Sequence, residues 1–165
     1  MSKESIVENI YFALYKYDSE QNVLNKALYL STATTLLKAL IQREGLNHPI
    51  KLVWYHPKKN EVVQEEYNVE KLLEKLDEMA QKIARVLGLA NKQEVLRGTP
   101  VAGDGVYWMQ DLLNAMSDVF TILEPIKQTI IEILVLAGYD DIKLTKIDEV
   151  VKAKTTRNTE LVRLG

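Results

Sequence analysis

One segment of the chain has glycine spacing that could bind phosphate. Residues 98–105 read GTPVAGDG, so Gly98 and Gly103 have the Gly-x4-Gly spacing of a phosphate-binding loop. In such a loop, Lys and then Ser or Thr follow, to pair with the phosphates and hold magnesium, whereas this chain continues with Asp104 and Gly105. A carboxylate repels phosphate, and the segment follows an expected helix rather than a strand. We interpret it as a connecting loop. Tyr107 and Trp108 beyond it are interpreted as core residues, although their rings could stack on a base.

The histidine and acidic residues do not form a recognisable catalytic or metal-binding set. His48 and His56 bracket an expected strand, and a metal site would need two or more further ligands. The nearby acidic residues, Glu61, Glu65 and Glu66, lie mainly on a strand whose side chains alternate between faces. Nothing marks the strained turn of a serine nucleophile. We therefore expect a protein that is not an enzyme and that uses no metal or cofactor.

A helix-turn-helix is the most specific DNA-binding pattern in the chain. Residues 83–90 (IARVLGLA) resemble the core of that motif, in which Gly88 would end the first helix and make the turn. A short second helix, residues 92–97, would present Lys92, Gln93 and Arg97 to the major groove. Against this interpretation, Val95 lies one position late and Gly98 limits the second helix to under two turns. An ordinary helical corner is the competing interpretation.

Basic residues gather in two other places. One group lies at the tip of an expected hairpin, and the other lies in an expected C-terminal helix that also carries acidic residues. Both are candidate contacts for a phosphate backbone, and both could equally be solubilising surface. With the helix-turn-helix positions, the candidate nucleic-acid-binding residues are Lys58, Lys59, Lys92, Arg97, Lys152, Lys154 and Arg157.

Composition predicts a globular protein. Of the 165 residues, 47% are hydrophobic and 27% are charged, there is no cysteine, and the formal net charge is −2. The acidic balance argues against a strongly basic protein that binds duplex DNA by itself. The N-terminus lacks the layout of a signal sequence, and the most apolar stretch, Ile126–Ala137, is shorter than the roughly 20 residues that cross a bilayer. We expect a cytoplasmic protein with no membrane contact. The richness in Lys and Glu and the missing Cys are typical of heat adaptation.

Hydrophobic periodicity predicts a mainly α-helical bundle with one small β-hairpin inserted between helices. We expect a single helical domain over residues 1–165, with the hairpin at about 50–67 and its turn at 57–60. Helices are expected at 4–17, from a cap at Asp18 or Ser19 to residue 43, from a cap at Asn68 to Gly88, and at 92–97. Further helices should follow Asp104, Pro125 and Thr145. Thr34 and Thr35 leave open whether the second helix is one element or two.

The N-terminal third resembles a known family. Residues 10–17 (IYFALYKY) and 22–28 (NVLNKAL), with a hairpin inserted between helices, resemble the small subunit of archaeal type I-A CRISPR effector (Cascade) complexes. The resemblance implies a non-enzymatic subunit that lines the guide-RNA complex and helps to hold displaced or target DNA. Its partners would be other effector subunits, guide RNA or target DNA, and possible further copies of itself. The alternatives are a helix-turn-helix regulator, or a protein-only scaffold or virus-derived inhibitor.

Overall fold

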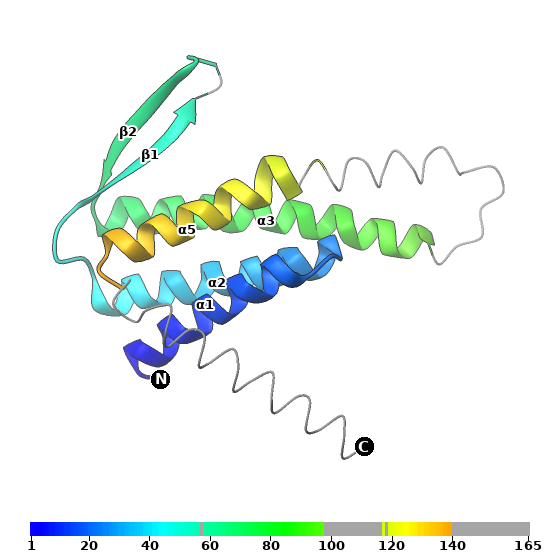
Figure 1. The fold of residues 1–165 in the computed structure, drawn as a ribbon, viewed down its shortest axis with the longest axis horizontal. Coiled ribbons are helices and arrows are strands. Elements are labelled where there is room, and N and C mark those ends of the chain that lie inside the picture. The colour runs from blue at the N-terminus through cyan, green and yellow to red at the C-terminus, as the bar shows by residue number, and fades with distance from the viewer. Residues whose placement is uncertain (57, 98–116, 118, 140–165) are drawn as a thin grey trace.

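The computed structural model describes residues 1–56, 58–97, 117 and 119–139, with the backbone alone for 91–97. Its first two helices, α1 (Lys3–Ser19) and α2 (Val23–Glu44), run antiparallel to each other (Figure 1). The prediction of a cap at Asp18 or Ser19 is wrong, because both residues lie in the last turn of α1. Asn22 caps α2 instead, and its side-chain oxygen accepts a hydrogen bond of 3.1 Å from the Asn25 backbone N–H.

The second helix is one continuous element across its central threonines. The Thr34 hydroxyl is buried and donates a 2.9 Å hydrogen bond to the Leu30 carbonyl, so it is satisfied within the helix. Gly45 ends α2 with a φ of 66°, a backbone conformation that suits glycine.

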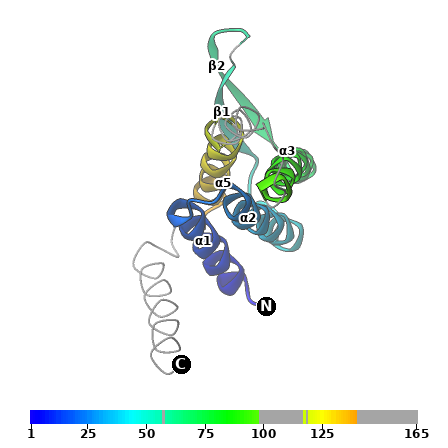
Figure 2. The same ribbon diagram turned by 90° about the vertical axis from the view of Figure 1, so that its right-hand side faces the viewer.

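The predicted hairpin is confirmed with the expected boundaries. Strand β1 (Ile50–His56) pairs antiparallel with β2 (Glu61–Tyr67), in a register that runs from Ile50 opposite Tyr67 to His56 opposite Glu61. One face of the hairpin is buried at its base, through Ile50, Leu52 and Tyr67. The hairpin stands above the helices, with its tip pointing away from them (Figures 1 and 2).

The third helix, α3 (Val69–Arg97), is longer than predicted. Asn68 caps it as expected, accepting a 2.8 Å hydrogen bond from the Lys71 N–H. The prediction that Gly88 ends this helix is wrong, and so is the separate short helix over 92–97, because α3 continues through both. Val86 and Ala90 are buried on either side of Gly88. A glycine inside a helix costs only about 1 kcal/mol relative to alanine, so this packing outweighs it. The turn that a helix-turn-helix requires is therefore absent from residues 83–97.

The remaining described helical segments are η1 (Val119–Leu123), a short π-helical stretch, and α5 (Glu124–Leu136). Pro125 lies in the first turn of α5, as expected, and Gly138 follows the helix with a φ of 86°. The apolar stretch at 126–137 is confirmed as a core helix with Ile126, Ile130, Ile133 and Leu134 buried. The predicted loop at 98–105, nearly all of the helix expected after Asp104, and the helix expected near Thr145 lie outside the described residues.

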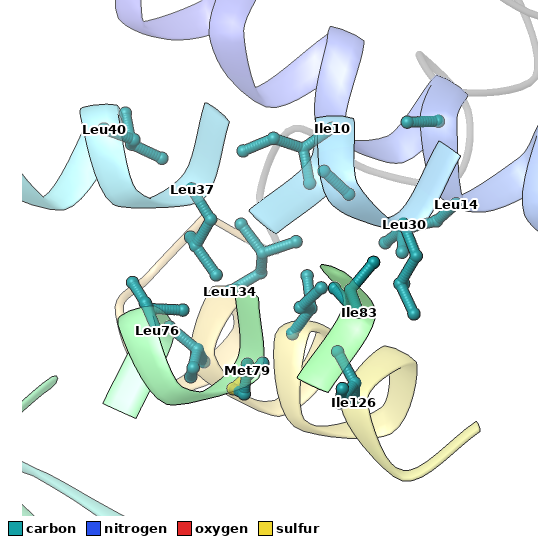
Figure 3. Close-up of a cluster of buried hydrophobic side chains, with 14 of the residues drawn as sticks. Ile10, Leu14, Leu30, Leu37, Leu40, Leu76, Met79, Ile83, Ile126 and Leu134 are labelled. Atoms are coloured by element: carbon teal, nitrogen blue, oxygen red, sulfur yellow. The ribbon is translucent and has the colours of Figure 1, made fainter. Parts of the chain in front are cut away.

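One hydrophobic core joins the four α-helices that the structure describes. Side chains from α1, α2, α3 and α5 converge in it, including Ile10, Leu37, Ile83 and Leu134 (Figure 3). Among the described helices, none combines the length and hydrophobicity that crossing a membrane requires. The prediction of a mainly helical protein with one hairpin between helices is confirmed.

Candidate nucleic-acid interface

A groove of about 800 Å³ lies where β1, α3 and the η1–α5 segment meet. Its apolar lining includes the buried side chains of Met79, Val86 and Ile126. Trp54 and Tyr55 of the hairpin also line the groove, and the Trp54 ring is on the hairpin face that bears the buried Leu52. The charged lining residues described by the structure are all cations, namely Lys75, Lys82 and Arg85. A groove that combines positive charge, an aromatic ring and an apolar floor has the composition of a surface that binds an anionic, aromatic ligand.

Helix α3 brings the three cations together. Lys75, Lys82 and Arg85 are separated by seven and then three residues, so they lie on one side of the helix. The neighbouring stripe of buried residues, which includes Met79, Ile83 and Val86, packs α3 into the core, chiefly against α2. Lys82 and Arg85 are exposed. Among the described residues, neither has a carboxylate within 4.0 Å, so their charges are available to a ligand.

Strand β1 positions Trp54. Strand alternation places Trp54 on the same hairpin face as the buried Leu52, and Trp54 is half-buried against the core. The backbone N–H of Val53 donates a 3.0 Å hydrogen bond to Glu132 Oε1 of α5, which attaches the strand to that helix. The Lys75 ammonium lies 5.3 Å from the centre of the Trp54 ring, in cation–π contact.

A charge cluster fixes the base of the hairpin to the start of α3. Glu65 of β2 forms an ion pair with Lys71 of α3 and accepts a 3.2 Å hydrogen bond from the Tyr67 hydroxyl. The hydrogen bond from Lys71 holds the pKa of the Glu65 carboxyl below its usual value, and the charges of Lys71 and Lys75 contribute to this. The cluster therefore orients β2 on the same helix that carries the groove cations.

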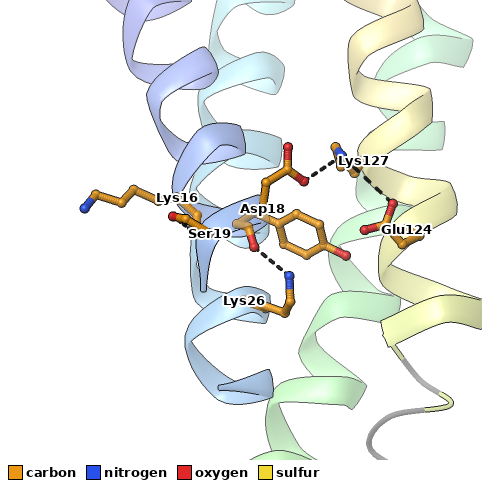
Figure 4. A network of polar contacts seen from close by, with 7 residues as sticks. Lys16, Asp18, Ser19, Lys26, Glu124 and Lys127 are labelled. Carbon is orange, nitrogen blue, oxygen red and sulfur yellow. Dashed lines mark hydrogen bonds and ion pairs between the residues drawn. The ribbon is translucent and has the colours of Figure 1, made fainter. Parts of the chain in front are cut away.

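A second polar cluster joins α1 to α5 and is structural. Lys127 of α5 is largely buried, 2.6 Å from Asp18 and 4.0 Å from Glu124 (Figure 4). Lys26 of α2 donates a 2.6 Å hydrogen bond to the carbonyl of Tyr17 at the end of α1. These cations already have anionic or carbonyl partners, so the cluster offers little unpaired charge to a ligand.

The structure describes the side chains of two of the seven predicted site residues, Lys58 and Lys59. Lys58 and Lys59 are exposed at the hairpin tip and do not line the groove. Lys92 and Arg97 lie within α3, but their side chains fall outside the described part of the structure. Lys152, Lys154 and Arg157 fall outside the described residues altogether. Their roles in binding remain predictions.

The groove residues Trp54, Lys75, Lys82 and Arg85 were not predicted from the sequence. A signal was present, because the three cations recur at helical spacing beside the predicted core stripe of α3. It is hidden along the chain because Glu74, Asp77 and Glu78 lie between the cations. The sequence predicts that Trp54 lies in a strand, but it does not predict that this strand lies beside α3.

The histidines do not contribute a metal site in the described structure. His56 Nδ1 accepts a 3.3 Å hydrogen bond from the Lys59 backbone N–H, within the hairpin turn. Over the residues that the structure describes, no three His, Asp or Glu side chains are grouped closely enough to hold a metal ion.

Comparison of the chain with protein-family models, curated proteins and solved structures finds no match. The resemblance to a CRISPR effector small subunit therefore stays a prediction.

Proposed function

We propose that this protein is a non-enzymatic nucleic-acid-binding protein that holds a strand along α3. The observation that carries the proposal is the groove, in which Lys75, Lys82 and Arg85 occur without a carboxylate among the described lining residues. Phosphate contacts from Lys and Arg position a nucleic acid, and the release of condensed counterions supplies most of the affinity.

The overall charge supports a local rather than a general interaction. With a formal net charge of −2, most of the protein surface does not attract a polyanion. Lys75, Lys82 and Arg85 give the groove a local positive charge that would attract the phosphates of a strand. We expect modest affinity for the isolated chain, which suits a subunit that adds contacts within a larger nucleoprotein complex.

The finer proposal follows the family resemblance. We propose that the complex is an RNA-guided antiviral effector of type I-A, in which the protein contacts other subunits and guide RNA or target DNA. Affinity purification from the native host, followed by sequencing of bound RNA, tests this. Recovery of effector subunits with repeat-derived RNA is expected, whereas recovery of the protein alone would remove the assignment to such a complex.

The groove is tested with fluorescence anisotropy on labelled DNA and RNA oligonucleotides at low salt. The double substitution Lys82→Ala with Arg85→Ala should weaken binding roughly tenfold or more. The slope of log K against log salt should become shallower by about 1.4, since each phosphate contact on a single strand contributes about 0.7.

The matched control is the double substitution Lys3→Ala with Lys16→Ala on α1, which changes the net charge equally, on a helix far from the hairpin (Figure 2). Lys58→Ala with Lys59→Ala tests the hairpin tip in the same assay. Equal losses in the groove and α1 variants would show that net charge, and not the groove, determines affinity.

A protein-only scaffold or inhibitor is the second candidate function. The outer hairpin face favours it, because Val53, Tyr55 and Val62 are 46%, 54% and 69% exposed. This candidate predicts that the wild-type protein has no affinity for any oligonucleotide even at low salt, which the same titration decides.

A further inference from the structure

We propose that the groove binds single-stranded nucleic acid and stacks an unpaired base on the ring of Trp54, in the place that the Lys75 ammonium occupies. This rests on the proposed function and deepens it, because it names the form of nucleic acid and the residue that distinguishes it from a duplex.

The Trp54 ring is both fixed in position and accessible from the groove. The ring is held in place, since Trp54 is half-buried against the core and its strand is attached to α5 through the hydrogen bond of Val53 to Glu132. It is also reachable, because it lines the groove and a charged ammonium lies 5.3 Å from its centre. A fixed, reachable aromatic ring is the platform on which single-strand-binding proteins stack bases.

The groove has an apolar floor. Met79, Val86 and Ile126 lie beneath the cations, and Pro125 adds to the same lining. A duplex presents phosphates and sugars to a protein surface and keeps the faces of its bases stacked inside. Those base faces therefore cannot contact the apolar floor of the groove. An unpaired base has an exposed π face that gains from leaving water. Phosphate binding alone would need the cations but neither the ring nor the floor.

Positively charged side chains extend along α3 from the Trp54 ring. Lys75 has a flexible stem, so its ammonium can leave the ring face when a base arrives and can pair with the phosphate of that nucleotide. Lys82 and Arg85 follow roughly 10 Å and 15 Å further along the helix axis, at about 1.5 Å per residue. The strand would run along α3 from the stacking position at Trp54 towards Arg85.

Three oligonucleotides of equal length test the proposal with the full chain. They are single-stranded thymidine DNA, the same backbone made of abasic sites, and a duplex. The abasic strand keeps every phosphate and lacks every base. It should bind at least about fivefold more weakly than the thymidine strand, since a stacked base contributes about 1–3 kcal/mol. The duplex should also bind more weakly than the thymidine strand.

Tryptophan fluorescence locates the stacked base. The thymidine strand should quench the emission of the wild-type protein and the abasic strand should not. In Trp54→Phe, binding should be largely retained while the quenching is lost. In Trp54→Leu, the thymidine and abasic strands should bind with equal affinity. If Trp54→Leu does not fold, the wild-type and Trp54→Phe titrations decide the question.

The possible failures are distinguishable. Equal affinity of the wild-type protein for the thymidine and abasic strands would overturn base stacking and leave phosphate binding intact. Tighter binding of the duplex would overturn the preference for single strands. Quenching in Trp54→Phe that is as large as in the wild-type protein, with Trp108 as the one tryptophan left, would remove Trp54 as the platform. Absence of binding to all three oligonucleotides would overturn the proposed function and this inference together.

Discussion

At the scale of single residues, Tyr17 has an unusual environment. Its side chain is fully buried, and the ammonium groups of Lys26 and Lys127 lie 4.1 Å and 5.9 Å from the centre of its ring. Its hydroxyl is buried and lies near the Glu124 carboxylate, but it does not reach the geometry of a full hydrogen bond in the described structure. Burial, and then the nearby charge of Glu124, raises the pKa of this hydroxyl above its ordinary value. The ring therefore stabilises the junction of α1, α2 and α5, while the contact of the hydroxyl with Glu124 is too weak to offset the cost of burying it.

Replacing Tyr17 with Phe should therefore leave stability unchanged or raise it by up to about 1 kcal/mol, because the change removes a buried hydroxyl that lacks a full hydrogen bond and keeps the ring. The matched control is Tyr67→Phe, which removes a hydroxyl that donates to Glu65 and should lower stability by about 1 kcal/mol. Urea unfolding followed by circular dichroism measures both. A loss in Tyr17→Phe as large as that in Tyr67→Phe would show that the Tyr17 hydroxyl is hydrogen-bonded in solution.

At the scale of elements, the continuity of α3 decides which interpretation of the region is right. The sequence around Gly88 fits both a turn between two short helices and one long helix. The structure has one helix from Val69 to Arg97, in which a Cβ built on Gly88 would meet no atom within 4 Å. This continuity aligns Lys75, Lys82 and Arg85 on one rigid element and so creates the basic side of the groove.

Substituting Gly88 with Ala should raise the free energy of unfolding by about 0.5–1 kcal/mol, because alanine loses less backbone entropy in a helix. Gly45→Ala is the contrasting control, since Gly45 ends α2 at a φ of 66° and a Cβ there is strained. That change should lower stability by more than about 0.5 kcal/mol. Thermal and urea denaturation measure both variants. Destabilisation by Gly88→Ala would indicate a turn at Gly88 rather than a helix.

At the scale of the whole molecule, three buried tyrosines from different regions respond to alkaline pH in the same direction. Burial is the largest cause in each case, raising the pKa of Tyr17 in α1, of Tyr67 in β2 to about 12, and of Tyr139 after α5. An unfolded chain releases these protons near pH 10. Between pH 10 and the raised pKa values of the folded protein, the folded state therefore binds more protons than the unfolded state. The free energy of unfolding falls as pH rises through this range.

We expect stability to be insensitive to these groups below pH 10 and to decline between pH 10 and about 12, the pKa of Tyr67. The decline should approach about 1.4 kcal/mol per pH unit for each tyrosine that stays protonated. Urea midpoints measured across this range, with phenolate absorbance of the folded protein, check the expectation. Tyr67→Phe should make the decline shallower. Normal titration of all tyrosines near pH 10 in the folded protein would contradict it.

Much of the fold was predictable because it depends on local patterns. Helical periodicity located α1, α2, the start of α3 and the core of α5, and strand alternation with a polar turn located the hairpin. The errors arose where local signals were nearly balanced. Asp18, Ser19 and Asn22 are all good capping residues, and only the path of the chain selects Asn22. Gly88 is compatible with a helix or a turn, and only packing at Val86 and Ala90 selects the helix.

The sequence by itself determined the fold class of this protein. Helical periodicity, one period-two segment and the absence of cysteine are properties of the chain that do not depend on how its elements pack. The tertiary structure alone decided which residues line the groove. Trp54 and Lys75 are 21 positions apart in the sequence, and Ile126 is a further 51 positions along. They share a groove because the hairpin is held over α5 and α3 by its buried face and by Glu132. Contacts between residues so far apart in the sequence depend on how the helices and the hairpin pack together. Local sequence patterns do not specify this packing.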